Sequence, residues 1–180
     1  MYPAPQGGFS RLLSEDFLRE IQENNRQYYW TGSMKTTQNM VYEFTSEQII
    51  KGSGYITRQC SGSSEIEIGT VYASELGITL LLDVDRYTLD NAEIKMFFHL
   101  VLADGSEEIV PMGIFEVSEA NRHIKTLELK AYDYMLRFDE TLTVTSSTGT
   151  AYDYLNLACT ECKVEMNQRL NNSLSIRVYI

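Results

Sequence analysis

The chain has 180 residues, of which 43% are hydrophobic and 22% charged, so it is long enough for one globular domain with an appendage. Its net charge of −10, from 25 acidic and 15 basic residues, disfavours a protein that grips nucleic acid, because binding phosphates takes clustered lysines and arginines. No apolar run reaches the roughly 18 residues of a membrane helix, and the start lacks an export signal, so we expect synthesis in the cytoplasm and no membrane segment.

The N-terminal 35 residues form an extension in this interpretation. Residues 1–8 are rich in proline and glycine and are expected to be extended. Apolar residues then recur at helical spacing, with acidic residues near the start and Arg26 near the end, which predicts a helix over 14–26. The helix packs either on its own domain or on a neighbouring chain. Its candidate interface residues are Leu13, Phe17, Leu18 and Ile21.

Strand signals dominate the middle of the chain. Alternation begins at Met40, Tyr42 and Phe44, and further strands are predicted over 55–60, 65–68, 78–82, 94–102, 107–119 and 124–131. Asp104 and Gly105 form the dipeptide most typical of a hairpin turn, and residues 121–123 are a second predicted turn. Both turns are candidate interface sites, through Asp104, Gly105, Arg122 and His123.

The remaining pattern is mixed. A short helix is predicted over 132–138, a short strand over 141–145, a helix over 150–159 and a strand-like tail over 175–180. The tail has no partner strand evident in the sequence, so it is either the start of a further element or an edge strand lent to another chain.

Together these elements predict a mainly β (α+β) protein. We expect a small β-barrel, closed or nearly closed, with one N-terminal helix and one or two C-terminal helices. The predicted regions are an N-terminal extension and helix over 1–35, the barrel domain over 36–140, and the start of a second region over 141–180.

Cysteines and histidines offer one route to chemistry. Cys159 and Cys162 have the spacing of half a zinc site or a redox dithiol, and Cys60, His99 and His123 are the further ligand candidates. No second Cys-x-x-Cys completes a four-ligand set. The bland alternative is that the two cysteines pack as small residues where the last helix meets the barrel, and no metal or cofactor is predicted.

Carboxylates offer a second route. Asp83, Asp85 and Asp90 could supply oxygen ligands but lack the glycine and terminal glutamate of a calcium loop. The carboxylates available for acid–base catalysis are Glu116, Glu119, Asp133 and Asp139. Glu116 alternates with apolar neighbours as an outward-facing strand residue does, and no nucleophile elbow or phosphate loop is present, so no catalytic residue and no enzyme activity are predicted.

An ordered series of segments across residues 40–162 carries a family resemblance. The segments are Ile49-Ile50-Lys51-Gly52-Ser53, Cys60 to Gly69, Val71-Tyr72-Ala73-Ser74-Glu75-Leu76, Asp85-Arg86-Tyr87, Pro111-Met112-Gly113-Ile114-Phe115-Glu116-Val117, Glu119-Ala120-Asn121-Arg122, Ala131-Tyr132-Asp133-Tyr134-Met135 and Leu157-Ala158-Cys159. In this order and spacing the chain resembles the N-terminal part of tail-hub proteins, also called tail-tip or minor structural proteins, of tailed phages, prophages and phage-like particles of Gram-positive bacteria.

The resemblance implies a structural role. Such hubs form a ring, usually a trimer, at the distal end of the tail tube, join the tube to the spike or fibre apparatus, and let DNA pass through the bore. It also implies a location in the tail of a virion or phage-like particle that assembles in the bacterial cytoplasm. Family hubs run on for several hundred residues with a second barrel, whereas this sequence stops at Ile180.

Charge is compatible with that role. Between Asp83 and Glu140 there are 13 acidic and 6 basic residues, a net charge of −7. The acidic surface either serves solubility or lines a bore from which DNA phosphates are repelled. The alternatives left open are a small zinc- or ligand-binding enzyme domain using Cys159, Cys162 and a histidine, and a carrier that positions a wall hydrolase.

Overall fold

The computed structural model describes residues 13–58, 71–140, 143, 148–165 and 177–179. Two helices, nine strands and two 3₁₀ turns are found in this part of the chain. In chain order they are α1 (Glu15–Glu20), β1 (Gln27–Lys35), β2 (Val41–Thr45), β3 (Tyr55–Thr57), β4 (Glu75–Leu80), η1 (Arg86–Thr88), β5 (Glu93–Val101), β6 (Glu107–His123), β7 (Thr126–Asp133), η2 (Tyr134–Phe138), β8 (Thr148–Thr150), α2 (Ala151–Glu161) and β9 (Arg177–Tyr179). The prediction of a mainly β protein with few helices is therefore confirmed.

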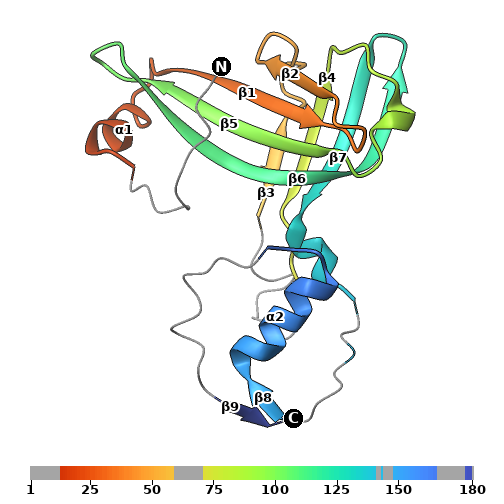
Figure 1. Ribbon diagram of the computed structural model, residues 1–180. Helices are drawn as coiled ribbons and strands as arrows, with labels where there is room; N and C mark the ends of the chain where they lie inside the picture. Colours follow the sequence, from red (N-terminus) through yellow and green to blue (C-terminus); the bar gives the residue numbers. More distant parts are fainter. Residues whose placement is uncertain (1–12, 59–70, 141–142, 144–147, 166–176, 180) are drawn as a thin grey trace.

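Seven strands form one antiparallel sheet in the order β2-β1-β5-β6-β7-β4-β3. The sheet curls strongly, so that the β2 and β4 regions approach each other (Figure 1). Residues after β2 complete this approach: Ile50 donates its N–H to the carbonyl of Thr79 at 2.9 Å, and Leu81 donates to Gln48 at 2.7 Å. The barrel is nevertheless not closed, because the edge strands β2 and β3 pair with no further strand within the described ranges.

The interior of the curl holds a single apolar core. The core forms because alternate side chains of a strand lie on the same face, and on these strands the inward-facing positions are apolar. On β4 the inward residues are Leu76, Ile78 and Leu80, none more than 2% exposed, and the neighbouring β7 supplies its own inward set at positions 127, 129 and 131. β1, β2, β5 and β6 add further inward residues, which are Met34, Phe44, Ile94, Met96, Phe115 and Val117.

Each edge strand covers a glycine of its neighbour with an aromatic ring. Gly32 of β1 pairs with Phe44 of β2, and a Cβ built on Gly32 would lie 2.3 Å from the Phe44 ring. At the other edge Gly77 of β4 pairs with Tyr55 of β3, and a Cβ there would lie 2.2 Å from the tyrosine ring. A side chain at Gly32 would therefore displace the Phe44 ring from the core, whereas one at Gly77 would displace the exposed Tyr55 ring, whose hydroxyl donates to Glu75.

The 17-residue strand β6 bends around this core at two irregularities. Its register against β5 shifts opposite Met96 and Phe97, where Met112 is the extra residue, and its register against β7 shifts at Ser118. An extra residue bends a strand and increases its twist. These bends let one strand serve two hairpins that point to opposite sides of the molecule.

Two predictions of local structure are wrong. The helix predicted over 14–26 is confined to Glu15–Glu20, because the chain turns over 21–25 and then enters β1, which pairs with β5 along nine residues. The turn predicted over 121–123 lies within β6, where Arg122 pairs with Leu127 and His123 with Thr126. The reversal is instead a two-residue turn at Ile124 and Lys125, since the inward position of Leu127 fixes the register of β7.

The C-terminal part lies below the sheet in Figure 1. Thr150 caps α2 in a capping box, in which its side chain accepts from the N–H of Asp153 and that carboxylate accepts from the Thr150 N–H. The strand-like tail does have a partner in its own chain, because β9 pairs with β8. The strands predicted over 65–68 and 141–145 lie wholly or mostly outside the described residues, and the division into three regions stays a prediction.

Candidate assembly surfaces

The first surface is the end of the molecule formed by α1 and the β5–β6 hairpin. Ser14 caps α1 and also binds the carboxylate of Glu108, which accepts from the Ser14 N–H at 3.2 Å and from its hydroxyl at 2.5 Å. Phe17 is 5% exposed and packs edge-on against Phe98, with 6.3 Å between the ring centroids. These contacts dock the short helix on the inward face of the hairpin, beyond the main core.

Four of the predicted interface residues lie on or beside this helix and differ in availability. Leu13 and Leu18 are exposed, Ile21 is half-buried, and Phe17 is buried against the chain's own sheet. The hairpin turn follows the prediction, because Gly105 has φ +82° and the Asp104 carboxylate accepts from the N–H and hydroxyl of Ser106. These two hydrogen bonds lower the pKa of Asp104. The polar groups of Asp104 and Ser106 thus bind each other within the turn.

The outer face of the same hairpin holds a buried histidine. His99 is 5% exposed beneath the ring of Tyr29, which stacks on it at 4.4 Å, and its Nε2 lies 2.8 Å from the hydroxyl of Thr31. Its Nδ1 makes no hydrogen bond in the described structure and lies 3.9 Å from the Glu107 carboxylate. Burial lowers the pKa of His99, and the nearby Glu107 carboxylate only partly opposes this.

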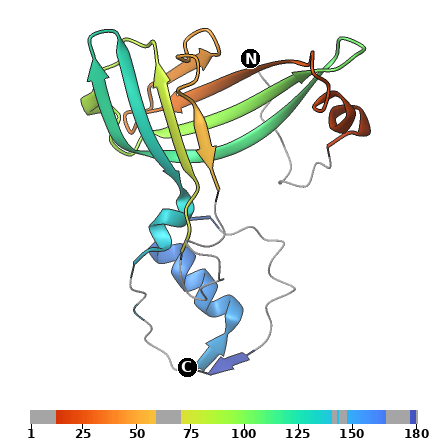
Figure 2. The ribbon, with the colours of Figure 1, turned by 180° about the vertical axis from the view of Figure 1, so that it is seen from behind.

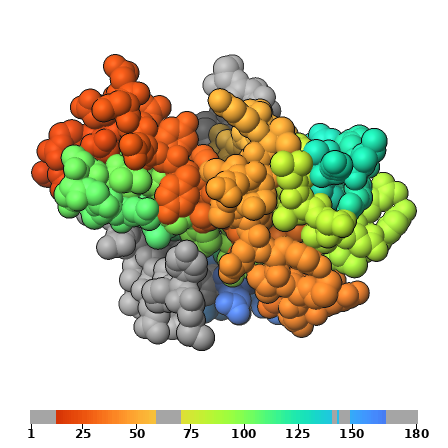
Figure 3. Space-filling model, turned by 90° about the horizontal axis from the view of Figure 1, so that it is seen from above, coloured from red at the N-terminus to blue at the C-terminus, as the bar shows by residue number. Residues whose placement is uncertain are grey.

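The second surface is the β6–β7 hairpin, at the opposite side of the molecule (Figures 1 and 3). Arg122 is half-buried and turns back into its own chain, where it donates to the carbonyl of Val84 at 2.7 Å and to the carboxylate of Asp83 at 2.5 Å. His123 is exposed and lies 3.6 Å from Glu128. The eight predicted interface residues therefore do not form one surface, since six lie at one end of β6 and two at the other.

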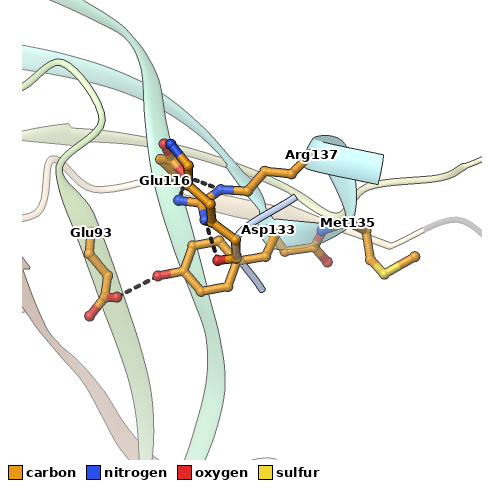
Figure 4. Close-up of polar contacts among 7 residues, drawn as sticks. Glu93, Glu116, Asp133, Met135 and Arg137 are labelled. Carbon is orange, nitrogen blue, oxygen red and sulfur yellow. Dashed lines mark hydrogen bonds and ion pairs between the residues drawn. The ribbon is translucent and has the colours of Figure 1, made fainter. Parts of the chain in front are cut away.

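A third feature, which sequence reasoning missed, lies where β7 runs into η2. Figure 4 shows Arg137 of η2 reaching Glu116 of β6, with 2.8 Å from Nε and 2.5 Å from Nη2 to the same carboxylate oxygen. The Arg137 guanidinium also lies 4.5 Å from the ring centroid of Tyr134, whose hydroxyl donates to Glu93 at 2.5 Å. We call Glu93, Glu116, Tyr134 and Arg137 the η2 network. It braces the short turn against two strands.

Charges within the η2 network are balanced by these contacts. Burial, followed by the hydrogen bond to Glu93, raises the pKa of Tyr134 to about 12, so its hydroxyl keeps its proton. Burial works against ionisation of Glu93, but the hydrogen bond from Tyr134 and the ammonium of Lys95 outweigh it and lower the pKa of that carboxyl. Neither group is poised to exchange a proton near neutral pH, which fits a structural role better than a catalytic one.

Arg137 also reaches the C-terminal part of the chain. Its Nη1 donates to the carbonyl of Lys163 at 3.0 Å. Lys163 follows α2 with φ +54°, and the N–H of Val164 binds the carbonyl of Cys159 at 2.8 Å, as in a left-handed helix end. One arginine thus joins the sheet, the 3₁₀ turn and the end of α2.

Beside the η2 network lies an open cavity of about 350 Å³. It is lined by the 90–91 turn, residues 116–118 of β6, residues 132–133 at the end of β7, and residues 136–137 of η2. Its apolar lining comes from Tyr132 and Leu136, whereas Asp90 stands at its exposed rim. The sequence held one signal for this site, the Tyr-Asp-Tyr-Met run before Arg137, but nothing in it placed Glu93 and Glu116 beside that run.

The candidate metal ligands do not come together. Cys159 is buried on α2 and Cys162 is half-buried at its end, while His99 and His123 lie on the sheet. Among the described residues no group of three or more His, Cys, Asp or Glu side chains could hold a metal ion. Burial, with Cys162 close by, raises the pKa of Cys159, which disfavours the thiolate that zinc binding needs. Cys60 lies outside the described residues.

The acidic candidates are also dispersed. Asp83 pairs with Arg122, and Asp85 caps η1 by accepting from the N–H of Tyr87. Of the acid–base candidates, Glu116 is held by Arg137, Asp133 caps η2, and Glu119 and Asp139 are exposed. Their partners are arginines and backbone groups, as for residues that stabilise a fold.

Comparisons with known proteins give little further guidance. No protein-family model and no curated protein matches the chain. A search of solved structures finds a chain in the virion of a native gene transfer agent particle, with 13% sequence identity and a TM-score of 0.48, covering 73% of this chain and 48% of that one. This chain thus spans about half the length of that protein. So low a TM-score carries no conclusion about fold or role.

No helix in the described ranges is long and apolar enough to cross a membrane.

Proposed function

We propose that the chain is a structural component of a phage tail or phage-like particle, a hub or tail-tip ring subunit that joins the tail tube to the spike or receptor-binding apparatus. Its mechanism is assembly, with no bond made or broken. The expected partners are further copies of itself, most simply as a trimer, together with tail-tube proteins and distal spike or fibre proteins. DNA would pass the bore without specific binding.

One observation carries the proposal: three of the segments that resemble tail hubs occupy parts that shape the sheet. The stretch over 49–53 includes the bridge to β4, and the stretch over 111–117 contains the first bulge of β6. The stretch over 131–135 makes the passage from β7 into η2. A resemblance that includes the bends and closures of a sheet supports a shared architecture more than a shared reaction.

Exposed apolar groups at several sites support an assembly role. Leu18, Tyr55 and Val41 are each about half exposed, on α1 and on the edge strands β3 and β2 respectively. Unpaired strand edges and exposed apolar side chains are typical of surfaces that other chains cover. The acidic balance over 83–140 supports the non-adhesive bore, because repulsion from phosphates would let DNA slide.

Epitope labelling of particles tests this function. An epitope tag is added to the chain in the strain that encodes it, and particles are purified and examined by immunoelectron microscopy. Labelling at one end of the tail is expected. The proposal would be overturned by particles that contain no tagged chain, or by labelling confined to the head. A tag on an unrelated cytoplasmic protein of similar charge controls for adhesion to the particles.

Native mass spectrometry of the purified chain, without chelator, separates the proposal from the zinc-enzyme alternative. A trimeric or hexameric mass with no metal supports a ring subunit. A monomer with one zinc per chain supports Cys159 and Cys162 as ligands, and Cys162→Ser should then remove the metal.

A further inference from the structure

An isoleucine at the tip of the β6–β7 hairpin is the most exposed large apolar residue of the described chain. Ile124 is 95% exposed and follows His123, the last residue of β6. Two-residue hairpin turns favour asparagine and glycine, which accept positive φ, yet neither Ile124 nor Lys125 has it. Backbone geometry therefore does not call for isoleucine at this position, and a β-branched side chain in water gains nothing for the fold.

Lys125 adds a free charge to the same tip. Its side chain is exposed, and no ion pair engages it among the residues that the structure describes. His123 precedes the isoleucine, so the tip combines one apolar side chain with basic neighbours on a chain of net charge −10. An apolar group beside an unpaired cation would suit an apolar recess with a carboxylate at its rim.

The cavity beside the η2 network has this character. Tyr132 and Leu136 give it apolar lining, and its volume of about 350 Å³ leaves room for one branched aliphatic side chain. The Asp90 carboxylate at the rim is exposed and forms no ion pair in the described part of the chain. The other carboxylates of the lining are engaged, Glu116 by Arg137 and Asp133 by the N–H of Met135.

The tip and the cavity lie at opposite ends of the β6–β7 hairpin (Figures 1 and 2). The turn at residues 124–125 closes one end, and Phe115 pairs with Asp133 at the other, next to η2. A chain therefore cannot fill its own cavity with its own tip. A contact between two different patches of identical chains is heterologous, and it gives a ring when the rotation closes.

We propose that the β6–β7 tip of one copy inserts Ile124 into the cavity beside the η2 network of the next copy, with Lys125 facing Asp90. The occupant is a second copy of this chain because the one exposed cation of the tip matches the one unengaged carboxylate of the rim. The contact rests on the proposed ring subunit and names its interface. It can fail while the ring itself stands, if copies associate through other surfaces.

Sedimentation velocity of the full 180-residue chain across a concentration series tests the contact. Ile124→Asp should weaken self-association about tenfold or more, since it replaces a buried aliphatic group with a charge. Ile109→Asp is the matched control, because Ile109 is also an exposed isoleucine of β6, 40% exposed, but lies at the far end of the strand from the tip. Association unchanged by Ile124→Asp, or weakened equally by Ile109→Asp, overturns the proposal.

A charge exchange gives an independent measure. Lys125→Asp and Asp90→Lys should each weaken association severalfold, and the double variant should recover most of the loss, because it restores an opposite-charge pair across the contact. Loss that simply adds in the double variant overturns the pairing. A chain that stays monomeric at every concentration also overturns the contact, whereas tail labelling of particles decides the proposed function separately.

Discussion

The two hairpins that share β6 differ in whether the backbone of the turn requires the residues found there. In the β5–β6 turn, Gly105 takes φ +82° and the Asp104 carboxylate binds Ser106, so each special residue satisfies the backbone. In the β6–β7 turn, neither Ile124 nor Lys125 has the positive φ that would call for a special residue. A turn whose residues are explained by its own geometry leaves little for a partner, whereas a turn whose residues are not so explained has its side chains available.

The same contrast holds for what covers each hairpin. At the β5–β6 end, α1 packs Phe17 on Phe98 and binds Glu108 through Ser14. At the β6–β7 end, the inward residue Leu127 belongs to the core, but the tip beyond it carries the exposed Ile124. One end is completed within the chain, and the other is completed in our proposal by a second copy.

The largest expected effect is at the covered end. Phe17→Ala removes the side chain that holds α1 to the hairpin, and we expect about 2–4 kcal/mol of lost stability, as for a large buried aromatic on a peripheral element. Hydrogen exchange of amides in α1 should rise well before the strands exchange, which separates undocking from global unfolding.

Leu18→Ala is the control on the same helix, because Leu18 is 49% exposed. It should change stability by no more than about 0.5 kcal/mol. Equal effects of the two substitutions would mean that the α1 end is not completed by the Phe17 contact, and the contrast between the ends would fail.

A second prediction compares the turns directly. Gly105→Val places a β-branched residue at φ +82° and should cost about 1–2 kcal/mol through backbone strain, since a Cβ there meets no other atom within 4 Å. Ile124→Val should change stability by less than about 0.5 kcal/mol. The measurement is urea unfolding of both variants, and equal costs would show that the β6–β7 turn also depends on its residue.

Sequence patterns predicted the strands and the β5–β6 turn but misplaced the β6–β7 turn, for a physical reason. Alternation of apolar residues is a local signal, so the strands around Ile78, Ile94 and Leu127 were found, and Asp104–Gly105 gave its turn directly. The β6–β7 turn was placed two to three residues too early because Ile124 resembles a strand residue. Propensity alone could not show that the register of β7 forces the reversal there.

Non-local features escaped prediction altogether. The η2 network joins Glu93 and Glu116 to Tyr134 and Arg137, and the cavity beside it depends on the same approach. Both arise because β6 is shared by two hairpins and bends at two positions. The barrel was predicted from strand number, whereas closure depends on whether β2 and β3 meet, which is a three-dimensional property.

The stability of the β5–β6 end should depend on pH through His99, which is buried on the outer face of this hairpin. The folded pKa of His99 lies below its ordinary value of 6.5, so as pH falls below that value the unfolded chain takes up the proton first and the free energy of unfolding decreases. The slope should not exceed about 1.4 kcal/mol per pH unit, the value for one proton.

His99→Gln should flatten this slope between about pH 7 and 5, since it removes the titrating ring and keeps a polar group near Thr31. Carboxyls such as Glu93, whose pKa is lowered, retain their stabilising charge throughout this range and lose it only at more acidic pH. An unchanged slope in the variant would assign the acid sensitivity to groups other than His99.

The smallest expected effect is the most discriminating. Replacing Ile124 and Lys125 with Ser-Asn removes both side chains of the proposed contact and keeps turn residues that suit the negative φ of both positions, so monomer stability should change by no more than about 0.5 kcal/mol. The same variant should associate no better than Ile124→Asp, because it lacks both side chains of the proposed contact. Unchanged stability together with a loss of association would mean that the two side chains serve a contact between copies and not the turn itself. If instead the Ser-Asn variant is clearly less stable as a monomer, then Ile124 serves its own chain after all, and the difference between the two hairpins disappears.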